Sequence, residues 1–102
     1  MLQDAVWLLA RRAFYAREYA RALALLGQFA PESHLVATYE LFKAGALRAL
    51  SQSEASANAF RAAVIASHDA TFRAACSALA DRAASPIVPG EGPWAIGPRE
   101  PW

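Results

Sequence analysis

The segment SHLVATY at residues 33–39 returns as SHDATF at residues 67–72. The Ser-His pair at 33–34 recurs at 67–68, and the Ala-Thr-aromatic triplet at 37–39 recurs at 70–72, one position closer. Leu26 and Phe60 keep the same offset as the two Ser-His pairs. A period of about 34 residues indicates a helix-turn-helix unit that is repeated along the chain.

Apolar residues at helical spacing predict five helices and no strand. The predicted ranges are 2 to 16, 19 to 29, 33 to 50, 54 to 66, and 67 or 69 to 84. Pro31 ends the second helix, and Ser33 is the predicted N-cap of the third. The cluster of residues 51 to 53 separates the third helix from the fourth, and either Ser67 or Asp69 caps the fifth.

The composition divides the chain at about residue 85. Residues 1–84 hold 25 of the 26 alanines and one proline, whereas residues 85–102 hold five prolines and three glycines. Because proline and glycine disfavour helix, we expect one helical domain over residues 1–84 and an extended tail over residues 85–102. A length of 102 residues allows no second domain.

Charge and cysteine usage exclude several protein classes. Ten basic and nine acidic residues give a net charge of +1, which argues against bulk electrostatic binding of nucleic acid or membranes. A single cysteine forms no internal disulfide, and arginines interrupt every apolar run before it reaches membrane-spanning length. The first residues lack the pattern of a signal peptide. We expect a soluble intracellular protein, most simply cytoplasmic, without membrane insertion.

The stretch from Leu9 to Leu26 resembles a tetratricopeptide repeat. In that family's pattern, Ala10 and Ala22 take the two small-residue places and Leu26 takes the large apolar place. In the second repeat Gly45, Ser56 and Phe60 take these places. This repeat is one residue shorter than the first, and the closing proline is absent at His34 and His68. The resemblance implies a hairpin array of about two and a half repeats, without strands. Residues 9–45 are also similar to the opening repeats of the tetratricopeptide scaffold subunits of the anaphase-promoting complex.

The resemblance also implies a concave binding groove lined by the first helix of each repeat. Its predicted partner-binding residues are Trp7, Arg11, Tyr15, Tyr39, Phe42 and Lys43. Aromatic side chains at such a surface favour binding hot spots. Lys43 stands without the asparagines of the family's carboxylate clamp, so that clamp is not expected. The alternative is that Trp7 and Phe42 pack inside an alanine-rich core. In the tail, the predicted anchors on an apolar surface are Ile87, Val88, Trp94 and Trp102.

Catalysis and metal binding are not expected. His34 and His68 are interpreted as duplicated helix-start residues, and no further ligands stand at the spacing of a metal site. Cys76 lies among alanines without a base beside it, and no glycine-rich phosphate loop is present. We therefore predict no catalytic residues, no metal, no cofactor and no small-molecule substrate.

Three hypotheses of function remain. The first is a non-catalytic protein–protein interaction module, such as an adaptor, small chaperone or assembly subunit. The second is a structural subunit that is stable only within a larger complex, such as a scaffold or a secretion-chaperone heterodimer. The third is an RNA-binding hairpin that uses Arg11, Arg12, Arg17 and Arg21. Because two and a half alanine-rich repeats make a thin core, a partner protein or self-association is expected.

Overall fold

The structure is a computed structural model, and it describes residues 2–85 and 92–93. These residues form helices, turns and connections, and no strand occurs among them. The helices are α1 (Leu2–Tyr15), α2 (Tyr19–Leu26), the short 3-10 helix η1 (Ser33–Leu35), α3 (Val36–Ala49), α4 (Ser53–Ala66) and α5 (Ala70–Asp81). The predicted all-α hairpin array with five α-helices is therefore confirmed for this part of the chain.

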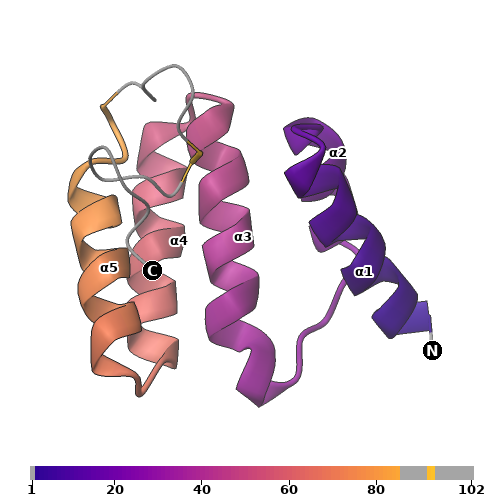
Figure 1. Ribbon diagram of the computed structural model, residues 1–102, viewed down its shortest axis with the longest axis horizontal. Coiled ribbons are helices and arrows are strands. Elements are labelled where there is room, and N and C mark those ends of the chain that lie inside the picture. The colour runs from indigo at the N-terminus through magenta and orange to yellow at the C-terminus, as the bar shows by residue number, and fades with distance from the viewer. Residues whose placement is uncertain (1, 86–91, 94–102) are drawn as a thin grey trace.

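The central helix of the array is α3. On one side it packs against α4, which in turn packs against α5, and on the other side it contacts the α1–α2 hairpin (Figure 1). Successive helices run in opposite directions (Figure 1). Because α3 has neighbours on both sides, seven of its fourteen residues are buried. Both halves of the molecule therefore depend on this one helix.

The helices keep a constant spacing along the chain. The first helices of the hairpins, α1, α3 and α5, begin at Leu2, Val36 and Ala70. The second helices, α2 and α4, begin at Tyr19 and Ser53. The starts of equivalent helices are thus separated by the same number of residues throughout. The repeated Ala-Thr-aromatic triplets after the histidines are separated by one residue fewer.

The α1–α2 and α3–α4 turns have the same geometry. In each turn one residue adopts a left-handed backbone, with φ 64° at Arg17 and 62° at Ser51. The amide of the next residue donates to the carbonyl five residues earlier, at 2.9 Å in both turns. These hydrogen bonds join Glu18 N to Ala13 O, and Gln52 N to Leu47 O. This is the Schellman arrangement, which satisfies the last carbonyls of a helix.

The crossing of α3 and α4 is marked by Ser56. This residue is fully buried, and its hydroxyl donates to the carbonyl of Ala44 at 2.8 Å. Ala44 occupies the place in α3 that Ala10 occupies in α1, and both alanines are buried. Ala44 and the predicted crossing residue Gly45 are both buried on α3. Counted from Ala44, the spacing to Phe60 equals that from Ala10 to Leu26 in the first hairpin.

The ends of the helices follow the predicted breaks with three differences, of which one is that α5 ends at Asp81, three residues before the predicted end. Asp69 caps α5, since its Oδ1 accepts from Phe72 N at 2.8 Å, while Ser67 Oγ accepts from Asp69 N at 3.1 Å. Ser33 is not the cap of α3. It begins η1, and α3 starts after Leu35 without a side-chain cap.

The connection between α2 and α3 is longer than predicted. Helix α2 ends at Leu26, three residues before the predicted end, and so does not reach Phe29. The side chain of Gln3 on α1 holds this connection. Its Oε1 accepts from Ala30 N at 2.7 Å, and its Nε2 lies 3.4 Å from the carbonyl of Gln28. The first hairpin is thereby tied to the chain that leaves it.

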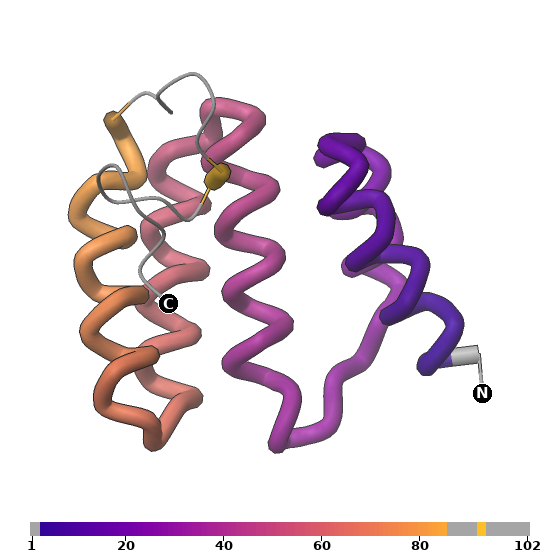
Figure 2. The backbone as a smooth tube through the Cα atoms, in the orientation of Figure 1, coloured from indigo at the N-terminus to yellow at the C-terminus, as the bar shows by residue number. Residues whose placement is uncertain are grey.

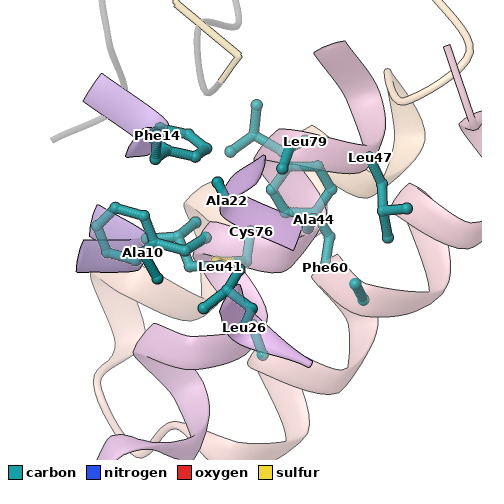
Figure 3. Packing of buried hydrophobic residues seen from close by; sticks show 14 of the residues in the cluster. Ala10, Phe14, Ala22, Leu26, Leu41, Ala44, Leu47, Phe60, Cys76 and Leu79 are labelled. Atoms are coloured by element: carbon teal, nitrogen blue, oxygen red, sulfur yellow. The ribbon is translucent and has the colours of Figure 1, made fainter. Parts of the chain in front are cut away.

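Large apolar side chains from all five α-helices of the described residues form the core. Leu26 of α2, Leu41 of α3 and Phe60 of α4 gather in one cluster, to which Leu79 of α5 belongs (Figure 3). Phe60 and Leu79 have no exposed surface. Alanines occupy most of the other buried positions, so each large side chain fills a space that its neighbours leave open.

Only a small part of the predicted tail is described. The tail anchors Ile87, Val88, Trp94 and Trp102 lie outside the described residues. Of the chain after Ser85, Gly92 and Pro93 are described, and Pro93 is buried. Figure 2 shows this short stretch beside the later turns of α3.

We expect the substitution Ser51→Gly to raise the free energy of unfolding by up to about 1 kcal/mol. A left-handed backbone costs a residue with a side chain roughly 1–2 kcal/mol, and the greater freedom of glycine in the unfolded chain cancels part of the gain. The control is Ser77→Gly at an exposed position inside α5, which should lower stability by roughly 0.5–1 kcal/mol. Urea unfolding followed by circular dichroism compares them, and a destabilised Ser51→Gly would contradict the turn geometry.

We expect Ala44→Leu to lower the free energy of unfolding by on the order of 1–3 kcal/mol, because a buried crossing has no room for a larger side chain. The matched control is Ala74→Leu, at an exposed position on α5, which should change stability little. Thermal unfolding measures both variants. Equal melting temperatures for the two variants would show that Ala44 does not lie at the crossing.

Candidate interaction surfaces

An aromatic cluster joins the first hairpin to α3. Its centre is Phe42, whose ring lies edge-on to the rings of Trp7, Phe14 and Tyr15 on α1, with centroid distances of 5.6, 5.0 and 5.8 Å. Phe29, from the α2–α3 connection, stacks on Trp7 with a centroid distance of 5.0 Å. Edge-to-face and offset-stacked rings attract each other beyond their apolar burial. The cluster therefore joins α1 and the α2–α3 connection to α3, beside the contact that α2 makes with the same helix.

Two of the predicted groove residues belong to this cluster and to the core. Trp7 is 9% exposed and Phe42 is 6% exposed. They do not line an open surface, and their burial supports the alternative, in which both pack inside the protein. The physical reason is the shortage of other large side chains. Apart from Trp7 and Phe14, the buried residues described on α1 are the small side chains Ala10 and Ala13.

The other four predicted groove residues are partly or largely exposed. Tyr15 is 67% exposed, although one side of its ring contacts Phe42. Tyr39 is partly buried, and its hydroxyl lies 3.2 Å from the carbonyl of Leu26. Lys43 lies 4.0 Å from a carboxylate oxygen of Glu40. The structure thus leaves Tyr15 and Lys43 as the accessible parts of the predicted groove.

The arginines of the first hairpin do not form one basic surface. The guanidinium of Arg11 lies over the ring of Trp7, 5.2 Å from its centroid. Arg21 pairs with Glu18 at 3.3 Å, and Arg17 occupies the left-handed turn position. Two of the four cations therefore already have partners within the chain, which weakens the case for phosphate binding here.

A cleft of about 780 Å³ opens between the first turns of α3 and α5. Its lining combines two imidazoles, several hydroxyls and a small apolar surface. The lining residues are Ser33, His34, Ala37, Thr38, Ala66, Ser67, His68, Asp69, Thr71 and Phe72. Both Ser-His pairs of the duplicated segment, and the threonine that follows each of them, therefore line the same space. This volume falls within the range of ordinary ligand-binding pockets.

The duplication brings both histidines of the sequence to one cleft. His34 and His68, which were interpreted as helix-start residues, do lie at or just before helix starts. Their common cleft was not predicted. Because α3 and α5 run in the same direction on either side of α4, equivalent residues at their starts face each other across its end. The repeated Ser-His pair was the signal that could have revealed this.

The polar groups of the cleft are partly engaged by local contacts. The Nδ1 of His34 lies 3.6 Å from a carboxylate oxygen of Glu32, and both side chains are largely exposed. One oxygen of Asp69 is used in capping α5. Among residues 2–85 and 92–93, no group of three or more His, Cys, Asp and Glu side chains is placed to hold a metal ion. The cleft thus offers hydrogen-bonding groups around an apolar floor.

Cys76 does not take part in either surface. It is fully buried, and burial raises the pKa of its thiol to about 11. Since the thiolate is the reactive form, the thiol is a poor nucleophile at neutral pH. Its surroundings are those of a structural cysteine.

No family model, curated protein or solved structure matches this chain. None of the helices in the described ranges is long and apolar enough to cross a lipid bilayer. The surfaces themselves therefore carry the case for a function.

At pH 8, the thiol of Cys76 should react with a disulfide reagent such as Ellman's reagent far more slowly in the folded chain than in the chain unfolded by urea. The folded chain keeps the thiol proton up to about pH 11, whereas the unfolded thiol loses it near pH 9.0. Stability should therefore be complete below pH 9.0 and fall as the pH rises towards 11. Burial, and next the charge of Glu40, raise the pKa of Tyr39 too, which acts in the same direction.

The variant Cys76→Ala isolates the contribution of the thiol. It should keep only the part of the alkaline loss that Tyr39 causes, as measured by urea unfolding at several pH values. Rapid labelling of native Cys76 at pH 8 would contradict its burial.

Proposed function

We propose that this chain is a non-catalytic protein–protein interaction module of the tetratricopeptide type, which binds a segment of a partner protein. The resemblance in sequence is supported by the constant spacing of equivalent helices and by the two matching turns. Arrays of this kind present extended surfaces along their hairpins, and peptide binding is their common use.

The observation that carries the proposal is the cleft between the starts of α3 and α5. An extended peptide exposes backbone donors and acceptors, and it needs partners for them when it is bound. The hydroxyls of Thr38 and Thr71 and the imidazoles of His34 and His68 provide such partners along both walls. Phe72 adds an apolar surface for a side chain. An open cleft with this mixture suits a peptide segment better than a wholly apolar ligand.

A second candidate, a subunit of a larger complex, is favoured by exposed apolar residues. Leu8 and Leu9 on α1 are 48% and 44% exposed, and Ile65 on α4 is 82% exposed. Because these side chains lie on two helices, α1 and α4, they suggest contacts with more than one neighbouring subunit. An RNA-binding function gains no such support, because Arg11 and Arg21 are engaged within the chain.

The test is site-specific crosslinking from the cleft in native lysate. A photoreactive amino acid replaces Thr38 at the cleft or, as a control, Asn58 at an exposed position on α4. We expect one protein to be crosslinked from the cleft position and not from the control position. The double variant His34→Ala/His68→Ala should lose this product, whereas Arg61→Ala on the exposed side of α4 should keep it.

Crosslinking that is equal from both positions, or unchanged in the double histidine variant, would reject the cleft as the binding site. Light scattering of the purified chain measures its state of association and so tests the second candidate, a subunit of a larger complex. A subunit that depends on a larger assembly should aggregate or self-associate when purified, and the variant Ile65→Ser should reduce this association.

A further inference from the structure

Arg48 is a buried charged side chain in the last turn of α3. It is 6% exposed, and its Nη1 donates to the carbonyl oxygen of Pro93 at 3.0 Å. The two residues are 45 positions apart, and the hydrogen bond between them is buried. The contact thus connects the central helix to the tail.

A buried arginine sets chemical requirements on whatever covers it. The guanidinium stays charged at all physiological pH values and carries five N–H donors and no acceptor. Taking such a group out of water is costly unless acceptor atoms replace the lost water. A segment that docks here must therefore bring oxygen acceptors towards α3.

Pro93 meets these requirements unusually well. Its ring is buried, and proline has no backbone N–H that burial could leave without a partner. Its carbonyl, the one hydrogen-bonding group of its backbone, receives the Arg48 donor. Gly92 before it carries no side chain that would hold the backbone away from the helix. A glycine–proline pair can thus lie against α3 without leaving the polar backbone groups of its proline unpaired.

A smaller cavity of about 270 Å³ adjoins Arg48. It lies between the α3–α4 turn and the residues that follow α5. Its lining residues are Arg48, Ala49, Ser51, Ser53, Ala83, Ala84 and Ser85. The site therefore has room next to the buried hydrogen bond for a further side chain of a docked segment.

We propose that the surface around Arg48 is a docking site for a glycine–proline segment, and that the chain's own tail is its occupant. Six residues separate Ser85 from Gly92, and so short a tether holds the tail at a millimolar effective concentration. An external segment of the same chemistry binds only when the tail has left. The tail is thus an internal competitor for the site.

The proposal concerns a surface distinct from the cleft. Arg48 lies in the last turn of α3, whereas Thr38 and His34 lie at or before its start. Loss of partner crosslinking at the cleft would therefore leave the Arg48 site unaffected, and the converse also holds. The two proposals can fail separately.

The first experiment measures order in the tail of the full chain by ¹H–¹⁵N heteronuclear NOE at Gly92. We expect Gly92 to be as rigid as the helices in the wild type and to become mobile in Arg48→Met, which keeps the buried volume without the donors. Arg61→Met, on the exposed side of α4, is the control and should leave Gly92 rigid. The amide spectrum of α4 and α5 shows that each variant is folded.

The second experiment uses a fluorescent peptide of residues 90–102 and fluorescence anisotropy. The full-chain variant Pro93→Arg places a cation beside Arg48 and should release the tail. This variant should bind the peptide at least about tenfold more tightly than the wild-type chain. Adding Arg48→Met to this variant should abolish the increase in peptide affinity. The loss of one hydrogen bond to a charged group lowers affinity by about tenfold.

Several results would overturn the proposal. Gly92 that is mobile in the wild type, or still rigid in Arg48→Met, would show that Arg48 does not hold the tail. Peptide binding that is absent, equal in the wild type and Pro93→Arg, or insensitive to Arg48→Met would show that the surface is not a docking site.

Discussion

The rings around Phe42 hold the two halves of this protein together. The first hairpin packs on α3 through the aromatic side chains of α1 and through α2, whose Leu26 belongs to the same core. Phe42 contacts three rings of α1, and Phe29 fills the space behind Trp7. A few large side chains thus do the packing that many medium-sized ones do in an ordinary helical core. The position of the first hairpin on α3 depends on this cluster and on the packing of α2 against α3.

The helices were predictable from the sequence because their ends carry local signals. Asp69 caps α5 through its own side chain, and Pro31 lies in the connection between α2 and α3, although α2 already ends at Leu26. These effects act within a few residues, so a single sequence reveals them. The prediction for Ser33 was wrong because a serine beside a helix start can also begin a 3-10 turn. The buried hydrogen bond from Ser56 to the carbonyl of Ala44 depends on the α3–α4 contact, which local sequence does not reveal.

The functional surfaces were less predictable for the same reason. Periodicity identifies the helix face that carries Trp7 and Phe42, but a groove and a core use the same face. Only the position of the neighbouring helix decides between them. The cleft combines the beginnings of two helices with the end of a third, and the Arg48 site joins residues 45 positions apart. Both sites arise from tertiary packing. The sequence revealed one component of each site, namely the repeated Ser-His pair of the cleft and the proline-rich tail.

The separation of Arg48 and Pro93 along the chain also bears on the order of folding. The turns and the Ser56–Ala44 contact join residues at most 12 positions apart, and even the Gln3–Ala30 contact spans only 27. Closing such short loops costs little entropy, so hairpins of this kind form early and fast. The Arg48–Pro93 contact spans 45 positions and needs α3 already in place. Pro93 then arrives after the helices have packed, and a chain still emerging from the ribosome exposes the Arg48 surface until Gly92 and Pro93 have emerged.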